Sequence, residues 1–317
     1  MGKGRMSALW CIFLCMMAGK LCAQEPLVFV PHWTAQAQFA GYYVAEANGF
    51  YRDAGLNVEI KHATAGGTLT DRIRKGEDIL FSMQLVSAMR LNDEGCHLVN
   101  VLQYFQQNSQ MIISHKPLTD VKSLNGQRIG HFRNGSSELA FAMARQYGLR
   151  VEWVPFLSNT NLFVSGAIDA TLAMSYNEQF KLKMAGQRIK PEQILRLCDI
   201  GYDVPEDGIY VNADYYSKRK ADIDKFAAAT KKGWEWAAAH PEDALDIVML
   251  YLQQNGVASN RIIQQWMLNE CIRLLGEKDT KRRSYRLSEK SVELANKILS
   301  ESGIIRNPIT YKHITQP

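Results

Sequence analysis

Residues 27–49 read LVFVPHWTAQAQFAGYYVAEANG. Leu27 to Val30 is an apolar run of the kind that forms a buried strand. Phe39 to Ala47 has the apolar spacing of a helix, and Asn48-Gly49 is typical of a helix end. A strand that leads through a polar and aromatic loop into a helix is the repeating unit of an α/β protein. We therefore predict this fold class, with a largely parallel sheet.

Strand and helix patterns recur along the rest of the chain as two units followed by helices. The first unit extends to a predicted strand at 111–114, and the second begins near Pro117 and ends with a predicted strand at 208–211. After Asp214 the apolar spacing is helical only. Such an order predicts two α/β lobes with a cleft between them and a helical C-terminal region, as in a hinged ligand trap.

These patterns also predict where the chain passes between the lobes. Strands near Ile112 and Ile209 are expected to cross from one lobe to the other. The predicted divisions are a signal peptide in residues 1–23, the first part of lobe 1 in residues 24–113, lobe 2 in residues 114–209 and a helical return to lobe 1 in residues 210–317.

The N-terminus has the pattern of a secretory signal peptide. Lys3 and Arg5 precede an apolar run at residues 8–18, and small Ala23 stands at the expected cleavage point. The run would rise only about 16 Å as a helix, which is too short for a ~30 Å hydrocarbon core. We expect cleavage near Ala23 and a periplasmic protein, with lipidation of Cys22 as the alternative.

Composition bounds the function. The 317 residues are 46% apolar and 22% charged, which is typical of a globular protein and excludes a disordered tail or a disulfide-dense scaffold. A net charge of +5 is too small to indicate nucleic-acid binding. After cleavage Cys96, Cys198 and Cys271 remain. One bridge between two of them stays possible, and buried thiols are the simpler interpretation.

The loop after the first strand carries the first candidate site residues. Ligands of open α/β sheets bind at the carboxyl ends of the strands. Trp33, Tyr42 and Tyr43 lie there with Phe39, and aromatic faces suit a planar ligand. Gln38 of the same block is included among the ligand-binding candidates. Packing in the core is the alternative for rings at helical spacing, whereas Trp33 precedes the helix and is expected in the cleft.

Several segments resemble the thiamine-pyrimidine-synthase-like family. The resemblance rests on Trp33 through Ile60, with GYYVA at 41–45, NGFY at 48–51 and AGLNV at 54–58. Later segments SLNGQRIG at 123–130, GAIDA at 166–170 and DVP at 203–205 follow the same order. This family includes periplasmic binding proteins for thiamine pyrimidine precursors and fungal enzymes that build the pyrimidine, and sulfonate-binding relatives share much of the pattern. The resemblance implies a type II periplasmic-binding-protein fold.

Two glycine-containing turns are expected to open on the same cleft. Gly135, Ser136 and Ser137 precede a predicted helix, whose free N–H groups would form an anion or acceptor site. A serine there could instead be a plain N-cap. Gly66 and Gly67 form a second strand-to-helix turn, with ordinary turn glycines as the alternative. The resemblance to sulfonate-binding relatives in the Gly-Ser-Ser run leaves an anionic ligand open.

Glu178 is the candidate that discriminates between ligands. It follows the predicted strand 170–173 in the segment SYNE at 175–178. The resemblance implies that an acidic residue here contacts a pyrimidine ring, and a carboxylate can accept hydrogen bonds from an amine and a protonated ring nitrogen. A first-turn glutamate favoured by the helix dipole is the alternative.

An enzyme is not expected. The resembling fungal enzymes use a cysteine-rich metal-binding motif, a lysine and a histidine that is consumed. The segment CDIGY at 198–202 has one cysteine, and FSMQLVS at 81–87 has neither lysine nor histidine. The seven histidines show no HxxxH spacing, and no Walker loop or Gly-x-Ser-x-Gly elbow occurs. We expect no cofactor and no metal.

These observations predict an exported solute-binding protein. We expect a monomer that captures a thiamine-precursor-like aminopyrimidine and delivers it to an ABC permease in the inner membrane. An alkanesulfonate or another small anion is the alternative ligand, and a ligand-sensing periplasmic module is the alternative role. A pyrimidine synthase ranks last.

Overall fold

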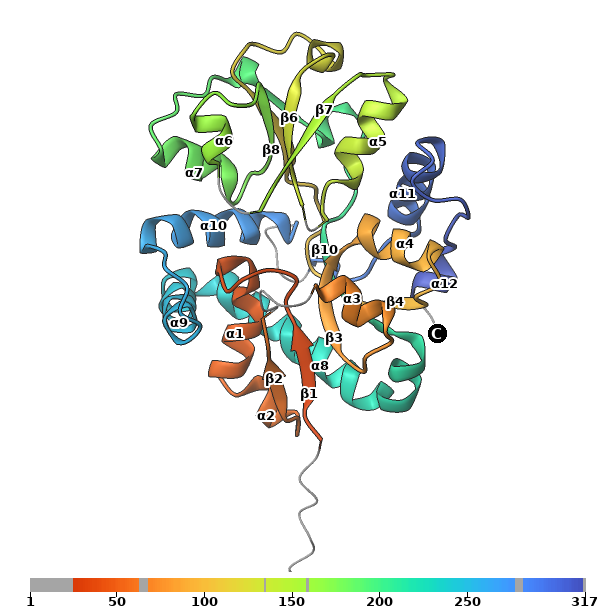
Figure 1. Cartoon of the computed structure of the whole chain (residues 1–317). Helices are drawn as coiled ribbons and strands as arrows, with labels where there is room; N and C mark the ends of the chain where they lie inside the picture. The colour runs from red at the N-terminus through yellow and green to blue at the C-terminus, as the bar shows by residue number, and fades with distance from the viewer. Residues whose placement is uncertain (1–24, 63–67, 134, 158–159, 277–281, 316–317) are drawn as a thin grey trace, which may run out of the picture.

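The computed structural model describes residues 25–62, 68–133, 135–157, 160–276 and 282–315. Within them the chain forms two α/β lobes, one above the other in Figure 1, each built on a five-stranded sheet. The predicted signal peptide lies outside the described residues. No helix in the described ranges combines the length and the apolar character needed to cross a membrane.

The first lobe is built on a sheet with the order β2-β1-β3-β10-β4. Its strands are β1 (Leu27–Val30), β2 (Val58–Ile60), β3 (Leu80–Gln84), β4 (Leu98–Gln103) and β10 (Asp207–Asn212). β1 is parallel to β2 and β3, whereas β10 is antiparallel to both β3 and β4. The predicted first strand is confirmed at its bounds.

The second lobe is built on a sheet with the order β7-β6-β8-β5-β9. Its strands are β5 (Gln110–Ser114), β6 (Arg128–Phe132), β7 (Glu152–Phe156), β8 (Ala170–Met174) and β9 (Ile194–Arg196). β6 is parallel to β7 and β8, and β5 is antiparallel to β8 and β9. Both sheets are therefore mixed, which corrects the expectation of a largely parallel sheet.

The mixed pairing follows from where the chain changes lobes. β5 and β10 are the first strands after each passage, and each enters its sheet in the opposite direction to its neighbours. Neither strand spans both sheets, so the expected crossing strands near Ile112 and Ile209 are wrong in detail. The passages are the segments 104–109 and 197–206, which precede those strands.

Helices cover the sheets. In the first part of the chain they are α1 (Ala40–Ala47), α2 (Phe50–Asp53), α3 (Leu69–Arg74) and α4 (Leu85–Asp93). The second lobe has α5 (Glu138–Gln146), α6 (Asn161–Val164) and α7 (Glu178–Met184). The C-terminal region has α8 (Ala213–Ala239), α9 (Pro241–Gln254), α10 (Arg261–Leu274), α11 (Glu289–Glu301) and α12 (Tyr311–Thr315). Short 3₁₀ turns are η1 (Ala37–Phe39), η2 (Val121–Leu124), η3 (Pro191–Gln193) and η4 (Cys198–Ile200).

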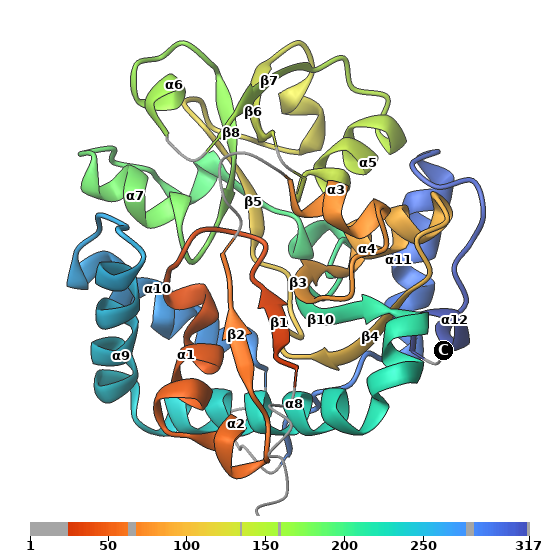
Figure 2. The ribbon, with the colours of Figure 1, turned by 60° about the horizontal axis from the view of Figure 1, so that its bottom comes forward.

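The helical return packs mostly on the first lobe. Figure 2 shows α8 running beneath the first sheet beside α1 and α9. Two helices of the return also contact the second lobe. α10 touches α7, and α11 lies against α5, where Arg145 Nη1 donates to the carbonyl oxygen of Ser302 at 3.0 Å. A return of residues 210–317 to the first lobe alone therefore does not describe the packing of α10 and α11.

Candidate ligand-binding site

A cavity lies between the two lobes. It contains about 320 Å³ of empty space, counting the part that opens to solvent. The loop after β1 supplies four lining residues from the first lobe, namely His32, Trp33, Gln36 and Gln38. The ends of β6 and β8 and the turns that follow them supply the second lobe's share, namely Phe132, Ser136, Met174, Tyr176, Asn177 and Glu178. Strand ends thus face one another across the cleft, where open α/β sheets bind ligands.

Two aromatic rings approach one another across the cavity. Trp33 of the first lobe and Phe132 of the second have ring centroids 6.4 Å apart and an interplanar angle of 82°. This is an edge-to-face pair, a favoured arrangement of aromatic rings. The carbonyl oxygen of Trp33 accepts a hydrogen bond from His62 Nδ1 at 2.7 Å, which fixes the backbone of the loop. The ring of Trp33 therefore lies at the cavity wall on a loop that is fixed by His62.

The turn before α5 adds a strained residue to the cavity. Ser136 lines it with a φ of 63°, in the left-handed region that non-glycine residues rarely adopt. Gly135 precedes it with a φ of 107°. Ser137 occupies the N-cap position of α5, but its hydroxyl donates to the carbonyl oxygen of Phe132 at 3.3 Å and makes no cap bond. Backbone strain of this kind is concentrated at functional sites.

Glu178 reaches the cavity from the N-terminus of α7, and its side chain is buried. Its Oε2 accepts from the backbone N–H of Met174 at 3.0 Å, and its Oε1 accepts from Asn177 Nδ2 at 2.8 Å. Burial raises the pKa of this carboxyl, and the charge of Lys181 and the Met174 N–H oppose that shift. Asn177 Oδ1 is buried and has no hydrogen-bond partner in the described part of the chain. Asn177 Oδ1 is therefore available to accept a hydrogen bond from a ligand, and the Glu178 carboxyl lies beside it.

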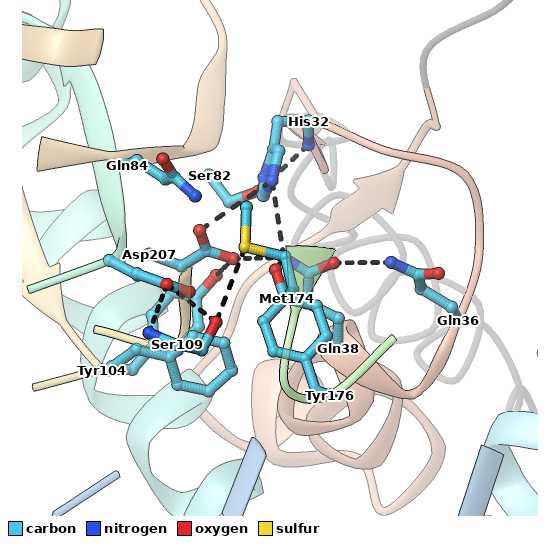
Figure 3. A network of polar contacts seen from close by, with 12 residues as sticks. His32, Gln36, Gln38, Ser82, Gln84, Tyr104, Ser109, Met174, Tyr176 and Asp207 are labelled. Atoms are coloured by element: carbon cyan, nitrogen blue, oxygen red, sulfur yellow. Dashed lines mark hydrogen bonds and ion pairs between the residues drawn. The ribbon is translucent and has the colours of Figure 1, made fainter. Parts of the chain in front are cut away.

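A polar network forms the floor beneath the cavity (Figure 3). Gln38 Nε2 donates to Asp207 Oδ2 at 2.7 Å and to the hydroxyl of Tyr176 at 3.1 Å. Gln36 Nε2 donates to Gln38 Oε1 at 2.6 Å. His32 Nδ1 lies 2.8 Å from Ser82 Oγ. Gln38 thereby joins the first lobe, the second lobe and the strand β10 that follows the second passage.

A second buried carboxylate joins the two passages between the lobes. Glu206 Oε1 accepts from the backbone N–H and from the hydroxyl of Ser109, at 2.6 Å and 2.8 Å. Burial, followed by the charge of Asp207, raises the pKa of Glu206 to about 8. Asn108 Nδ2 also donates to the carbonyl oxygen of Val204 at 3.2 Å. The segments on which the lobes would turn are thus bonded to one another.

The structure brings together some of the expected site residues and separates others. Trp33, Gln38, Ser136 and Glu178 line the cavity. Tyr42 and Tyr43 are fully buried in the first lobe, where they stack on Phe29 and Tyr251 at 4.1 Å each. Tyr42 and Tyr43 are therefore core residues, which is the alternative interpretation of rings at helical spacing, and they do not line the cavity. Gly135 and Ser137 lie in the turn beside Ser136 without lining the cavity. Gly66 and Gly67 fall outside the described residues.

Sequence reasoning missed the remaining lining residues. They are His32, Gln36, Phe132, Met174, Tyr176 and Asn177. Most lie within one to four residues of a candidate that was recognised, in the HWTAQAQ loop and the SYNE segment. Polar residues directly after a strand were the available signal. Alternation along a strand does not predict Phe132 or Met174 as lining residues, because both read as core positions.

The described lining of the cavity contains one carboxylic acid, Glu178, and one imidazole, His32, and no Lys or Arg. Asp207 lies just beneath, with its Oδ1 3.8 Å from His32 Nε2. This arrangement favours a ligand that offers hydrogen-bond donors or positive charge over one that offers an anionic group.

The described residues offer little for metal or thiol chemistry. In the described ranges no three His, Cys, Asp or Glu side chains are grouped closely enough to hold a metal ion. Cys96, Cys198 and Cys271 are unpaired, and burial raises the pKa of all three thiols. Desolvation of this kind disfavours the reactive thiolate.

Comparisons with known proteins agree with this architecture. The chain is similar to riboflavin-binding protein RibY of Chloroflexus aurantiacus, with 23% identity over 68% of this chain and 64% of that protein, slightly less than two thirds of its length. It is 20% identical to 4-amino-5-hydroxymethyl-2-methylpyrimidine phosphate synthase THI13 of Saccharomyces cerevisiae over 69% of each chain. The periplasmic aliphatic sulphonate binding protein SsuA of Escherichia coli has the same fold, with a TM-score of 0.65, 14% identity and 92% of each chain covered.

The decisive match is to a family model. The model described as NMT1/THI5 like matches residues 36–244, which include the loop at Gln36 and Gln38, both passages between the lobes and the SYNE segment. This range is well over half of the chain, so the chain belongs to the NMT1/THI5 like family.

Proposed function

We propose that this protein is an exported solute-binding protein of an ABC importer, and that it captures a small aminopyrimidine between its lobes. One observation carries the proposal. Trp33 and Glu178 face a single cavity from opposite lobes, and its described lining contains no Lys or Arg. A ligand that contacts both lobes can drive closure, because it binds the closed state better than the open one.

The ligand class follows from the chemistry of the two walls. Trp33 offers a planar face on which a ring can stack. Glu178 as a carboxylate accepts only, and Asn177 Oδ1 is an acceptor beside it. An aminopyrimidine presents an exocyclic amine next to a ring nitrogen, which becomes a second donor when it is protonated. A buried acceptor pair and a planar donor edge are complementary.

A sulfonate is the second candidate, supported by the fold it shares with the sulphonate binding protein. Its site would be Ser136 and the N-terminus of α5, where backbone N–H groups favour an anion. Burial of a sulfonate beside Glu178 and above Asp207 would bring like charges together in a poorly hydrated space. The aminopyrimidine is therefore the better match to the described lining.

Export and delivery to a permease complete the proposal. The basic and apolar pattern at residues 1–23 supports secretion into the periplasm. Solved structures with this fold are named as periplasmic and import-system components, which supports the same compartment and partner. Synthase activity, for which several relatives are named, is the competing role. The proposal of binding without catalysis rests on the segment at 81–87, which has neither lysine nor histidine.

Calorimetry with a three-ligand panel tests the proposal. The mature protein is titrated with 4-amino-5-hydroxymethyl-2-methylpyrimidine, riboflavin and methanesulfonate. We expect binding of the aminopyrimidine with a negative heat-capacity change and no binding of methanesulfonate. Exclusive binding of methanesulfonate or riboflavin would replace the ligand assignment, and synthesis of 4-amino-5-hydroxymethyl-2-methylpyrimidine phosphate by the protein would replace the role.

A further inference from the structure

The segment Ser175–Glu178 has a second connection besides the cavity. It links β8 to α7, and three of its residues, Tyr176, Asn177 and Glu178, line the cavity. Its first residue, Ser175, is buried and points to α10 instead. A residue that contacts another helix and residues that line the cavity are therefore neighbours on one short turn.

The contacts between Ser175 and α10 are specific. Trp266 Nε1 donates to the carbonyl oxygen of Ser175 at 3.0 Å. The hydroxyl of Ser175 donates to Glu270 Oε2 at 2.9 Å. Arg273 Nη2 donates to the same Glu270 oxygen at 3.1 Å. Both the backbone and the side chain of one residue of the turn are thus fixed by α10.

An aromatic stack supports the same junction. The rings of Phe180 on α7 and Trp266 on α10 are 4.7 Å apart with an interplanar angle of 7°. The hydrogen bond from the indole nitrogen and the stack on the indole face therefore act on the same side chain. Trp266 is the residue through which α10 holds both the turn and the first turn of α7.

α10 belongs to the opposite lobe from this turn. It packs on α9 and on η1 of the first lobe, where Gln264 Oε1 accepts from the backbone N–H of Ala37 at 2.7 Å. Ala37 lies in the loop that carries Gln36 and Gln38 at the cavity wall. One helix therefore contacts the ligand-facing loop of the first lobe and the ligand-facing turn of the second.

We propose that Ser175, Trp266 and Glu270 are positioning residues for ligand binding: they latch the lobes in the closed form and hold Asn177 and Glu178 in place. Opening of the cleft would separate Trp266 from Ser175, so the latch stabilises the closed form without touching the ligand. The nature of the ligand rests on the function proposed above, whereas the latch does not.

The variant Trp266→Phe tests the latch, because it removes the indole N–H and keeps a ring that can stack on Phe180. We expect 4-amino-5-hydroxymethyl-2-methylpyrimidine to bind about 3- to 10-fold more weakly, because about one hydrogen bond is lost. The ligand should also dissociate faster. The melting temperature without ligand should change little. Trp236→Phe on α8, whose ring stacks on His240, is the matched control and should bind like the wild type.

A double-mutant cycle separates positioning from general stability. If the latch places Glu178, the effect of Glu178→Gln on affinity is smaller in the Trp266→Phe background than in the wild type. Additive effects, or an affinity of Trp266→Phe within 1.5-fold of wild type, overturn the positioning role.

Small-angle scattering without ligand tests the latch independently of the ligand. If the wild type binds none of the three ligands tested above, the proposed ligand has failed, but the latch can still be tested. The latch predicts a larger radius of gyration for Trp266→Phe than for wild type and Trp236→Phe. Equal radii in the three proteins overturn the latch.

Discussion

The carbonyl oxygen of Gly41 on α1 faces Gly233 on α8 so closely that a Cβ atom added at Gly233 would lie 2.0 Å from it. In the other direction, a Cβ atom at Gly41 would lie 2.4 Å from the ring of Trp234. The two helices can cross at this distance only because both positions are glycine. α1 follows the loop with Trp33, so this crossing also fixes one wall of the cavity.

The first prediction concerns this crossing. Gly233→Ala should reduce the free energy of unfolding by about 1–3 kcal/mol or more, because the added methyl group forces the two helices apart. Alanine otherwise favours a helix interior by about 1 kcal/mol, so the expected sign depends on the close contact. Urea unfolding measures it. Lys232→Ala on the exposed side of α8 is the control and should stay within about 0.5 kcal/mol. Equal stability of Gly233→Ala and wild type would contradict the contact.

Helix α1 shows what the sequence predicts and what it does not. The spacing in the stretch 39–47 predicted a helix, and α1 is found at Ala40–Ala47. It did not predict the direction of Tyr42 and Tyr43, because the ring that reaches a ligand and the ring that packs in a core have the same spacing. That difference depends on α8 and Tyr251, which are far away in sequence.

Local patterns predicted elements better than their connections. The repeated strands and helices gave two lobes, but the antiparallel entry of β5 and β10 depends on long-range pairing. The helical spacing after Asp214 predicted α8, which begins at Ala213. Asn212, whose side chain accepts from the backbone N–H of Asp214, is the capping signal that marks this start.

The second prediction is a pH dependence of stability from Glu206. Burial raises its pKa to about 8 in the folded protein, while an unfolded glutamate titrates near 4.3. Between these values the folded state binds more protons than the unfolded state, so stability falls as pH rises, by up to about 1.4 kcal/mol per pH unit. Below about pH 4 and above about pH 8 this contribution is constant.

Glu206→Gln isolates the effect, because an amide oxygen can still accept from Ser109. Urea unfolding of both proteins at pH 5, 6, 7 and 8 should give a difference that grows with pH in favour of the variant. Glu178, whose pKa burial also raises, is present in both proteins, so its contribution cancels. Parallel stability curves would show that Glu206 does not titrate in this range.

The third prediction concerns Trp33. Trp33→Ala should weaken aminopyrimidine binding more than Glu178→Gln does, because stacking and apolar burial are both lost. Trp33→Phe should restore part of the affinity. Trp153→Ala is the control. It removes a tryptophan of the second lobe that packs edge-to-face on Phe141, and it should lower stability without changing affinity. Calorimetry and thermal unfolding together decide it, and an unchanged affinity of Trp33→Ala would remove Trp33 from the site.

The last prediction concerns the acceptor pair of Asn177 and Glu178. In the structure Asn177 Nδ2 donates to Glu178 Oε1, so the oxygen of Asn177 is left to accept. In Glu178→Gln an NH₂ group can replace that carboxylate oxygen, and Asn177 then turns its amide over to accept from it. The pair would present a donor where it presented an acceptor, and a ligand with a donor edge would meet like groups.

We therefore expect Glu178→Gln to weaken binding of 4-amino-5-hydroxymethyl-2-methylpyrimidine by about 10- to 150-fold, the cost of about 1.5–3 kcal/mol for a hydrogen bond to a charged group. The ligand-free melting temperature should change little, since the amide oxygen still accepts from the Met174 N–H and the buried charge is removed. Glu152→Gln, at a carboxylate on β7 that is 66% exposed, is the matched control and should bind normally. If Glu178→Gln binds like the wild type, the carboxylate only holds the turn between β8 and α7 through Met174 and Asn177, and the aminopyrimidine assignment loses its main support.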